Sequence, residues 1–270
     1  MNKILPVAAI TLKEGIRNRA LQGILGIGGM LCLVYLAVMP MFSFERSKVM
    51  VDLVSASLSV AGLVIVIFLS ISMLTKDIHQ RSVCMILSRP VSRTAYVIGK
   101  FSGLAILVMI ATLLIAMISF AASYVGAQFS NVLEAPRNFS LLQAGLAYLL
   151  KYQGLIVLLS LAFLFTMVTT NEYLSMLLTA MTYLIGNSLE TIVKVASVGS
   201  DVELSPIYLN ALKLLTWIFP NLGAFDLKVY VAYGLDLPLV QVAWTMAYGI
   251  CYIALAVTLV VLVFNRKEIR

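Results

Sequence analysis

Long apolar runs alternate with short polar segments along the whole chain. Each run is continuously apolar over about 20 residues, the length that an α-helix needs to cross the hydrocarbon core of a bilayer. A membrane β-barrel would instead show segments of about ten residues with alternating polarity. The pattern therefore predicts an all-α integral membrane protein, a single transmembrane domain over 1–270. Its six expected transmembrane helices are 21–39, 53–74, 96–125, 155–168 with its flanks, 174–193 and 239–264.

Residues 2–18 precede the first run and have a periodic pattern of their own. Ile4, Ala8, Leu12 and Ile16 are spaced by four, which on a helix of 3.6 residues per turn makes one apolar stripe. The basic residues of this stretch lie on or beyond the opposite side. We predict an amphipathic helix lying in the membrane interface. A short disordered tail is the alternative.

Charge orients these predicted spans. The chain is 61% hydrophobic, has a mean hydropathy of +1.02 and a net charge of +7. With both termini cytoplasmic, the inner segments carry twelve basic and four acidic residues, and the outer segments carry seven and eight. Short loops rich in Lys and Arg stay in the cytoplasm, so both termini are predicted there. Nucleic-acid binding is not needed to explain the basic charge.

The segment 75–95, between the second and third predicted spans, has features of an ordered helix. Thr75 can cap a helix that Pro90 ends, and Ser92 can cap the helix that enters the third span. This helix would present apolar residues, including Ile86 and Leu87, beside basic ones. It fits a groove in another protein. A helix lying on the membrane with its basic residues on lipid phosphates fits equally well.

The segment 197–237, before the last span, mixes helix breakers with aromatic residues. Pro220 and Asn221 lie within it, next to Phe219 and Phe225. Such a sequence predicts short broken helices on the outer side that dip into the outer leaflet, because irregular backbone at membrane depth is tolerated where protein or a cavity covers it. We place this segment near an outer gate. The alternative is a helix hairpin lying on the membrane surface.

Few polar residues interrupt the predicted spans. Asn187 and Glu190 lie in the fifth, and Glu190 is followed by Lys194 at i+4. The charged pair is typical of a helix end near water, where an i,i+4 ion pair costs little free energy of desolvation. If it instead faces a central cavity, Asn187 and Glu190 become candidate substrate contacts.

No recognised catalytic or metal-binding pattern occurs in the chain. HExxH, GxSxG, GxGxxG and GxxxxGK[ST] are all absent, and Cys32, Cys84 and Cys251 are far apart. His79 has no partners at the spacings of a triad. No ladder of ionisable residues that would couple transport to protons crosses the spans. An enzyme is therefore not expected, and a transporter would need energy from another protein.

Three stretches resemble one known family. The sequence "ILSRPVSRTAYVIGKFSG" from Ile86 resembles the inner loop of type 2 ABC exporter permeases. "LTWIFPNLGAFDLK" from Leu215 resembles their outer Pro-Asn-Leu segment, and "VLVFNRKEIR" resembles their basic C-terminus. The resemblance covers essentially the whole chain. Within the family it is similar to the branch that includes the nitrous-oxide-reductase maturation and gliding-motility permeases.

The resemblance implies a permease of the bacterial cytoplasmic membrane that works as a dimer, either a homodimer or a pseudo-dimer with a paralogue. Its inner loop would be a coupling helix seated on a separate ABC ATPase subunit, which would hold the ATP and Mg²⁺, leaving this chain without a cofactor. The implied contact residues here are Asp77, Arg81, Ile86, Leu87, Arg89, Pro90 and Arg93. One departure is "QRS" at 80–82, where the family usually has Gly-Thr. A membrane anchor or mechanical transmitter in an ATPase-containing assembly is the alternative function.

Overall fold

The regular elements of the computed structural model are all helices in the part of the chain it describes, which is 4–18, 21–23, 26, 28–30, 34, 46–79, 92–129, 141–169, 171–198 and 219–266. The helices are α1 (Ile4–Arg17), α3 (Arg46–Val64), η2 (Ile65–Ser70), α4 (Ile71–His79), α6 (Arg93–Phe129), α7 (Leu141–Thr169), α8 (Glu172–Val198), η3 (Gly223–Phe225), α10 (Lys228–Tyr233) and α11 (Leu239–Arg266). The all-α prediction is confirmed for these residues.

Four helices in the described ranges are long and apolar enough to cross a membrane: Val54–Asp77, Arg93–Ala121, Leu142–Thr169 and Leu239–Arg266. The six expected spans are thus not confirmed. Most of the first expected span, 21–39, lies outside the described residues. The fifth coincides with α8, a helix of 27 residues that is not among the four.

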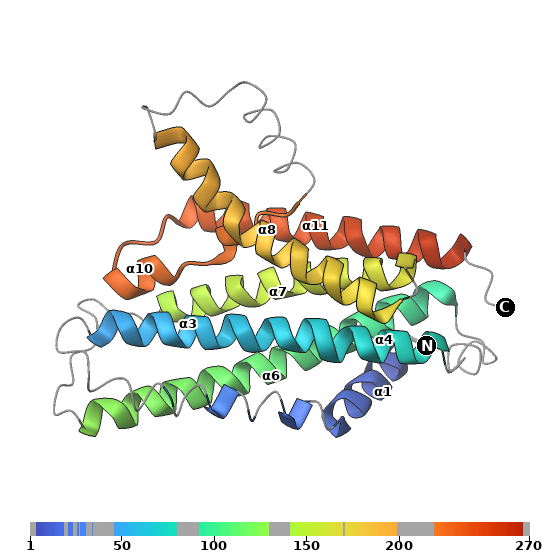
Figure 1. Cartoon of the computed structure of the whole chain (residues 1–270), viewed down its shortest axis with the longest axis horizontal. Coiled ribbons are helices and arrows are strands. Elements are labelled where there is room, and N and C mark those ends of the chain that lie inside the picture. The colour runs from blue at the N-terminus through green and yellow to red at the C-terminus, as the bar shows by residue number, and fades with distance from the viewer. Residues whose placement is uncertain are drawn as a thin grey trace.

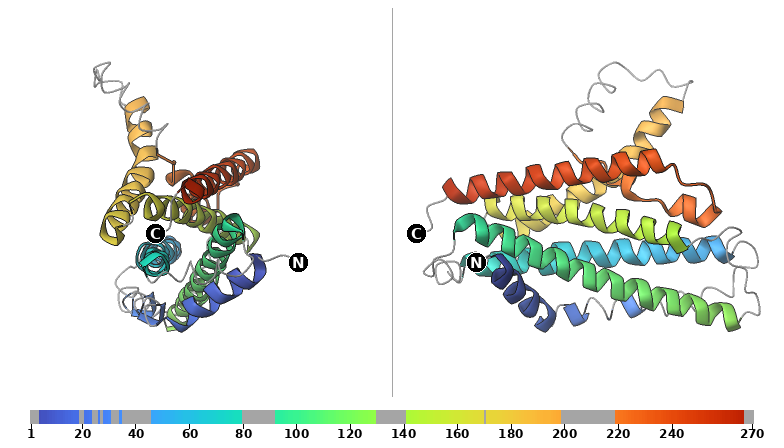
Figure 2. Two further views of the ribbon diagram at one scale, coloured as in Figure 1. Left: turned by 90° about the vertical axis from the view of Figure 1, so that its right-hand side faces the viewer. Right: turned by 180° about the vertical axis from the view of Figure 1, so that it is seen from behind.

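The spans form a bundle around α7 (Figure 1). Helices α3, α4, α6, α8 and α11 all contact α7, and the α7 span is the most buried of the four (Figure 2). The bundle has two ends. We call the end where α4 stops and α6 starts the loop end; the start of α1 and the end of α11 also lie there (Figure 1). The opposite end holds α10 and the start of α11.

Helix α1 packs obliquely on α6 near the loop end. The buried face of α1 consists of Val7, Ala8, Thr11 and Gly15, so the helix is rotated relative to the stripe expected from the sequence, whose Ile16 is exposed. The contact depends on two glycines of α6. A Cβ at Gly99 would lie 2.8 Å from the Val7 Cβ, and one at Gly103 would lie 2.8 Å from the Ala8 carbonyl oxygen. Small residues let helix backbones approach closely in membranes.

Substituting Gly103→Leu is expected to push α1 away from α6. Overpacking a tight contact of this kind costs about 1–3 kcal/mol, so the thermal unfolding midpoint in detergent micelles should fall. Gly145→Leu in α7 is the matched control, because nothing lies within 4 Å of a Cβ built at Gly145. Equal midpoints for the two variants would contradict the α1–α6 contact.

The second span is one continuous helix that changes geometry in its middle. Helix α3 passes into a π-helical segment, η2, and then into α4, which ends at His79. The Ser70 hydroxyl donates to the Ile65 carbonyl oxygen five residues back, at 3.3 Å. Thr75 is therefore inside a helix, and the expected helix start at Thr75 is wrong. The first residues of the polar stretch, including the buried Thr75 and Asp77, therefore continue the helix of the apolar run.

The expected cap on the third span is confirmed. The Ser92 hydroxyl accepts a hydrogen bond from the Ala95 amide at 3.2 Å, and the Ser92 carbonyl accepts one from the Tyr96 amide at 3.1 Å. Such a cap satisfies amides that have no partner within the helix. Helix α6 therefore starts at a defined residue, and this fixes one border of the 80–91 segment.

Candidate functional site

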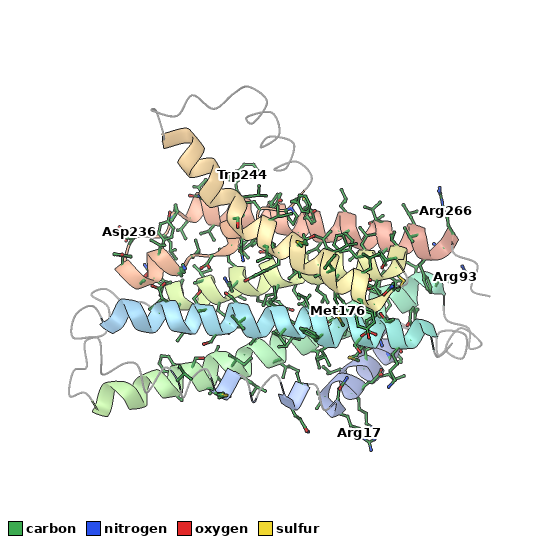
Figure 3. The ribbon with its side chains drawn as sticks, viewed as in Figure 1. Arg17, Arg93, Met176, Asp236, Trp244 and Arg266 are labelled. Atoms are coloured by element: carbon green, nitrogen blue, oxygen red, sulfur yellow. The ribbon has the colours of Figure 1, made fainter. Side chains whose placement is uncertain are left out.

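The described borders of the predicted coupling segment are the end of α4 and the start of α6. Asp77 and Arg93 lie in these helices, whereas the other predicted contact residues, Arg81, Ile86, Leu87, Arg89 and Pro90, lie outside the described residues. Arg93 is at the loop end beside Arg266 (Figure 3).

A cluster of charged residues joins three helices at this border. The Lys100 ammonium lies 2.6 Å from Asp77 Oδ2 and 3.6 Å from Glu14 Oε2. The Tyr96 hydroxyl donates a hydrogen bond of 2.9 Å to the same Asp77 oxygen. Lys100 and Asp77 are buried, and the Glu14 side chain is 35% exposed. Asp77 thus accepts bonds from α6 inside the chain, and α1 contributes the second carboxylate.

The start of α6 is also tied to the end of α11. The Arg93 guanidinium donates to the carbonyl oxygens of Phe264 and Asn265, at 3.3 and 3.2 Å. The Tyr96 and Phe264 rings are stacked with their centroids 5.8 Å apart. Carbonyls at a helix C-terminus have no partner within the helix and carry partial negative charge, so a guanidinium stabilises them. Helices α1, α4, α6 and α11 therefore meet at one place.

Sequence reasoning missed the roles of Lys100 and Glu14. The charge pattern includes both residues only among the twelve basic and four acidic residues of the predicted inner side. The available signal was Lys100 itself, because a lysine inside an apolar run requires an acidic partner. The identity of that partner depends on the packing of α1 and α4 against α6, which no local pattern contains.

A second group of residues lies at membrane depth in the other half of the bundle. Within the segment 219–238, the part before α10 passes between α7, α8 and α11, whereas α10 packs against α3 and α7. Phe225 is fully buried there, and a Cβ at Gly154 or Gly249 would lie 3.1 or 2.9 Å from it. Gly249 is ten residues into α11, about 15 Å from its start. The irregular backbone is therefore enclosed by protein, as membrane depth requires.

The backbone of this segment finds its partners in side chains and in α8. The Asn221 side-chain oxygen accepts from the Ala224 amide at 3.3 Å, and the Asn221 amide donates to the Tyr248 hydroxyl at 3.3 Å. The Leu222 amide donates to the Gly186 carbonyl oxygen at 3.1 Å, where α8 has no side chain in the way. Asn221 thus stabilises a turn.

Three of the four predicted gate residues come close together. The Pro220 carbonyl oxygen packs against Gly186, the neighbour of Asn187 in the sequence, and Asn221 follows it. Asn187 is half-buried, whereas the side chain of Glu190 lies outside the described residues. The structure brings Asn187, Pro220 and Asn221 to one level of the bundle.

Polar contacts join the 219–238 segment to α7, and α7 to α11. The Lys151 ammonium binds Asp226 Oδ2 at 2.9 Å. Two residues on, the Gln153 amide nitrogen donates to the Met246 carbonyl oxygen at 2.7 Å. The Gln153 side-chain oxygen is buried without a hydrogen-bond partner among the described residues. The sequence alone does not identify Asp226 as the partner of Lys151.

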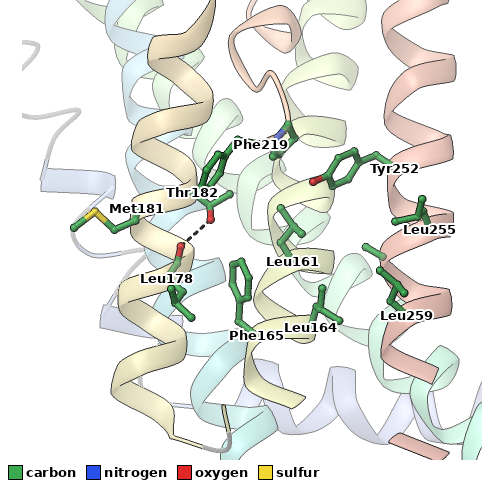
Figure 4. A pocket seen from close by; sticks show the side chains of 12 residues that line it. Leu161, Leu164, Phe165, Leu178, Met181, Thr182, Phe219, Tyr252, Leu255 and Leu259 are labelled. Atoms are coloured by element: carbon green, nitrogen blue, oxygen red, sulfur yellow. Dashed lines mark hydrogen bonds between the residues drawn. The ribbon is translucent and has the colours of Figure 1, made fainter. Parts of the chain in front are cut away.

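An apolar cavity of about 380 Å³ lies beneath the start of this segment, between α7, α8 and α11 (Figure 4). Phe219 and Pro220 form one wall, and Leu161, Phe165 and Leu259 are among the other lining residues. The Thr182 hydroxyl there donates to its own helix at the Leu178 carbonyl oxygen, at 2.8 Å. It therefore does not offer its proton to an occupant.

Comparison with known proteins identifies the family. The sequence matches the family described as ABC-2 family transporter protein over residues 6–269. The chain belongs to the ABC-2 transporter family. No curated protein matches it.

Family membership assigns the general role of the chain. The ABC-2 protein is a multi-pass membrane permease subunit of an ABC transporter and is not catalytic. Permeases of this family pair with ATPase subunits, so ATP hydrolysis is expected on a separate chain. In this ABC-2 permease, the Lys100 cluster borders the segment predicted to meet that subunit. The part of the 219–238 segment around Phe225 is enclosed by α7, α8 and α11.

Proposed function

We propose that this chain is the permease of an ABC exporter and that its ATPase subunit docks on segment 75–95. Of the contact residues named from the family resemblance, Arg81, Ile86, Leu87, Arg89 and Pro90 would meet the ATPase subunit. Asp77 and Arg93 instead bind inside the chain and hold the borders of the segment. The observation that carries the proposal is the anchoring of both borders of that segment. The α4 border is held through Asp77, and the α6 border through the Ser92 cap and Arg93. If the ATPase subunit displaces these borders, the movement is transmitted to the membrane-spanning helices that end there, α4 and α6. The absence of a GxxxxGK[ST] motif is consistent with ATP binding on the partner.

The proposed topology has six spans with the loop end in the cytoplasm of a bacterium. The spans not among the four apolar helices are then 21–39 and α8. Charge supports this orientation, since the basic residues concentrate on the segments assigned to the loop end. Helix α1 supports it too. Its outward side carries Leu5, Ile10 and Ile16 beside Lys13 and Arg17, a combination suited to an anionic lipid surface.

We further propose a homodimer or a pseudo-dimer with a paralogue, of the branch that the sequence resembles. Closure of the ATPase pair would drive the two loop ends together, and the 219–238 segment with Asn187, Glu190, Pro220 and Asn221 would gate release on the outer side. The coupling free energy in this scheme comes from contacts that differ between two states, so no chemistry is needed in this chain. The cavity beside Phe219 gives the segment room to shift.

Reversing two charges on the segment tests the docking proposal. Arg81→Glu with Arg89→Glu is expected to reduce recovery of the ATPase subunit about tenfold or more, since a lost charged contact at an interface costs about 2–5 kcal/mol. The measurement is ATP hydrolysis in the complex isolated through a tag on the permease. Arg93 is left unchanged because it supports α11.

Arg266→Glu is the matched control, an exposed basic residue at the same end of the bundle. It should leave recovery unchanged. Equal recovery in the double variant and the control would refute docking through this segment. ATP hydrolysis by the permease alone would refute the division of roles.

A further inference from the structure

We propose that Lys100 is a positioning residue that holds α1, α4 and α6 together as one rigid unit, so that a load applied where α4 ends and α6 begins also moves α1. This inference rests on the proposed function, because the load is the one that an ATPase subunit would apply. It extends that function by adding the N-terminal helix to the moving element.

The first step is the geometry of the charges. One ammonium group serves two carboxylates on different helices, at 2.6 Å from Asp77 on α4 and 3.6 Å from Glu14 on α1. Lys100 is itself on α6 and is 3% exposed. Without the ammonium, two carboxylates on different helices would face each other, and like charges at short range repel. The Lys100 ammonium on α6 therefore separates and neutralises the carboxylates of α4 and α1, and so links the three helices.

The second step is burial. An ion pair enclosed by protein contributes less to stability than apolar packing of the same volume, but it fixes geometry because each charge requires its partner. The Tyr96 hydroxyl holds the same Asp77 oxygen at 2.9 Å, so the carboxylate has little freedom. The pair therefore specifies the position of α4 relative to α6.

The third step is the packing of α1. Gly99 and Gly103 of α6 admit the α1 backbone at contact distance, on either side of Lys100 along the helix. Glu14 is in the last turn of α1, so the ammonium holds the far end of the same contact. The glycines align the two helices, and the charge prevents α1 from sliding along α6.

Distances between spin labels test the unit in nanodiscs, with the full chain and its three cysteines replaced. Labels at Lys13, Lys76 and Thr94 report on α1, α4 and α6, and all three side chains are exposed. Lys100→Met is expected to abolish the narrow distance peaks of both the 13–94 and the 76–94 pairs. Glu14→Gln, a milder change, should broaden only the 13–94 peak. Lys100→Arg, which keeps the charge, should restore narrow peaks, an effect that packing alone does not explain.

Lys151→Met removes the cation of a different ion pair, on α7 and away from the loop end, and should leave both peaks narrow. Narrow peaks that persist in both Lys100→Met and Glu14→Gln would overturn the proposal, whatever the partner does.

The consequence for coupling is measured in the complex with its ATPase subunit. A nucleotide-dependent shift of the 13–94 and 76–94 distances in step, lost in Glu14→Gln, is the expected result. A shift of 76–94 alone would overturn the participation of α1 while leaving the proposed function intact. If no distance responds to nucleotide although the peaks of the free permease depend on Lys100, the proposed function fails and the positioning role stands.

Discussion

Lys100→Met is expected to lower the free energy of unfolding by about 3–5 kcal/mol, because it leaves Asp77 buried without its cation. The Asp77 and Lys100 side chains are only 10% and 4% exposed, so water compensates little of the lost attraction. The Tyr96 hydroxyl remains as one donor to Asp77 and does not neutralise its charge. The measurement is the unfolding midpoint in detergent micelles under increasing SDS.

The double variant Lys100→Met with Asp77→Asn separates charge from packing. Removing both charges of a buried pair is often close to neutral, whereas removing one is strongly destabilising. The double variant should therefore recover most of the stability that Lys100→Met loses. A double variant as unstable as Lys100→Met would show that the side-chain volume of Lys100, and not its charge, supports this part of the bundle.

Phe225→Ala is expected to cost about 3–5 kcal/mol, the range for removing a large buried aromatic side chain. The ring is 1% exposed and fills the space beside Gly154 and Gly249, and its centroid lies 6.2 Å from that of Tyr248. Its loss would leave the irregular backbone of segment 219–238 poorly packed at membrane depth. The measurement is again the SDS unfolding midpoint, combined with protease cleavage within this segment.

Trp244→Ala is the matched control, since Trp244 is an aromatic residue of α11 that is 73% exposed (Figure 3). Its removal creates no cavity, so stability should change little. A Phe225→Ala variant as stable as Trp244→Ala would mean that the 219–238 segment does not depend on this anchor.

Much of the fold was predictable because membrane helices leave a strong local pattern. The runs that became α6 and α11, the Ser92 cap and the helical character of 4–17 all depend on neighbours within a few residues. The expected helix start at Thr75 was wrong because it, too, was based on neighbouring residues alone. A threonine before a polar stretch is a typical cap, but here α4 continues the preceding helix through η2.

The two sites were predictable only in outline. The local sequence indicated the segment 75–95 and the helix-breaking residues around Pro220, since charged and helix-breaking residues can be recognised without knowing how the helices pack. The partner of Lys100 and the seat of Phe225 were not predictable, because Asp77 and Glu14 lie on two other helices and Gly154 and Gly249 on two more. Glycine in an apolar helix does not reveal which side chain fills its space.

The sequence by itself determined that this protein is helical and crosses a membrane, because long apolar runs partition from water into lipid however the helices pack. Only the tertiary structure decided that α1 lies against α6, that one lysine serves carboxylates from two other helices, and that segment 219–238 enters the bundle. These outcomes depend on the shapes and charges of side chains far apart in the chain, which meet only after the helices have packed.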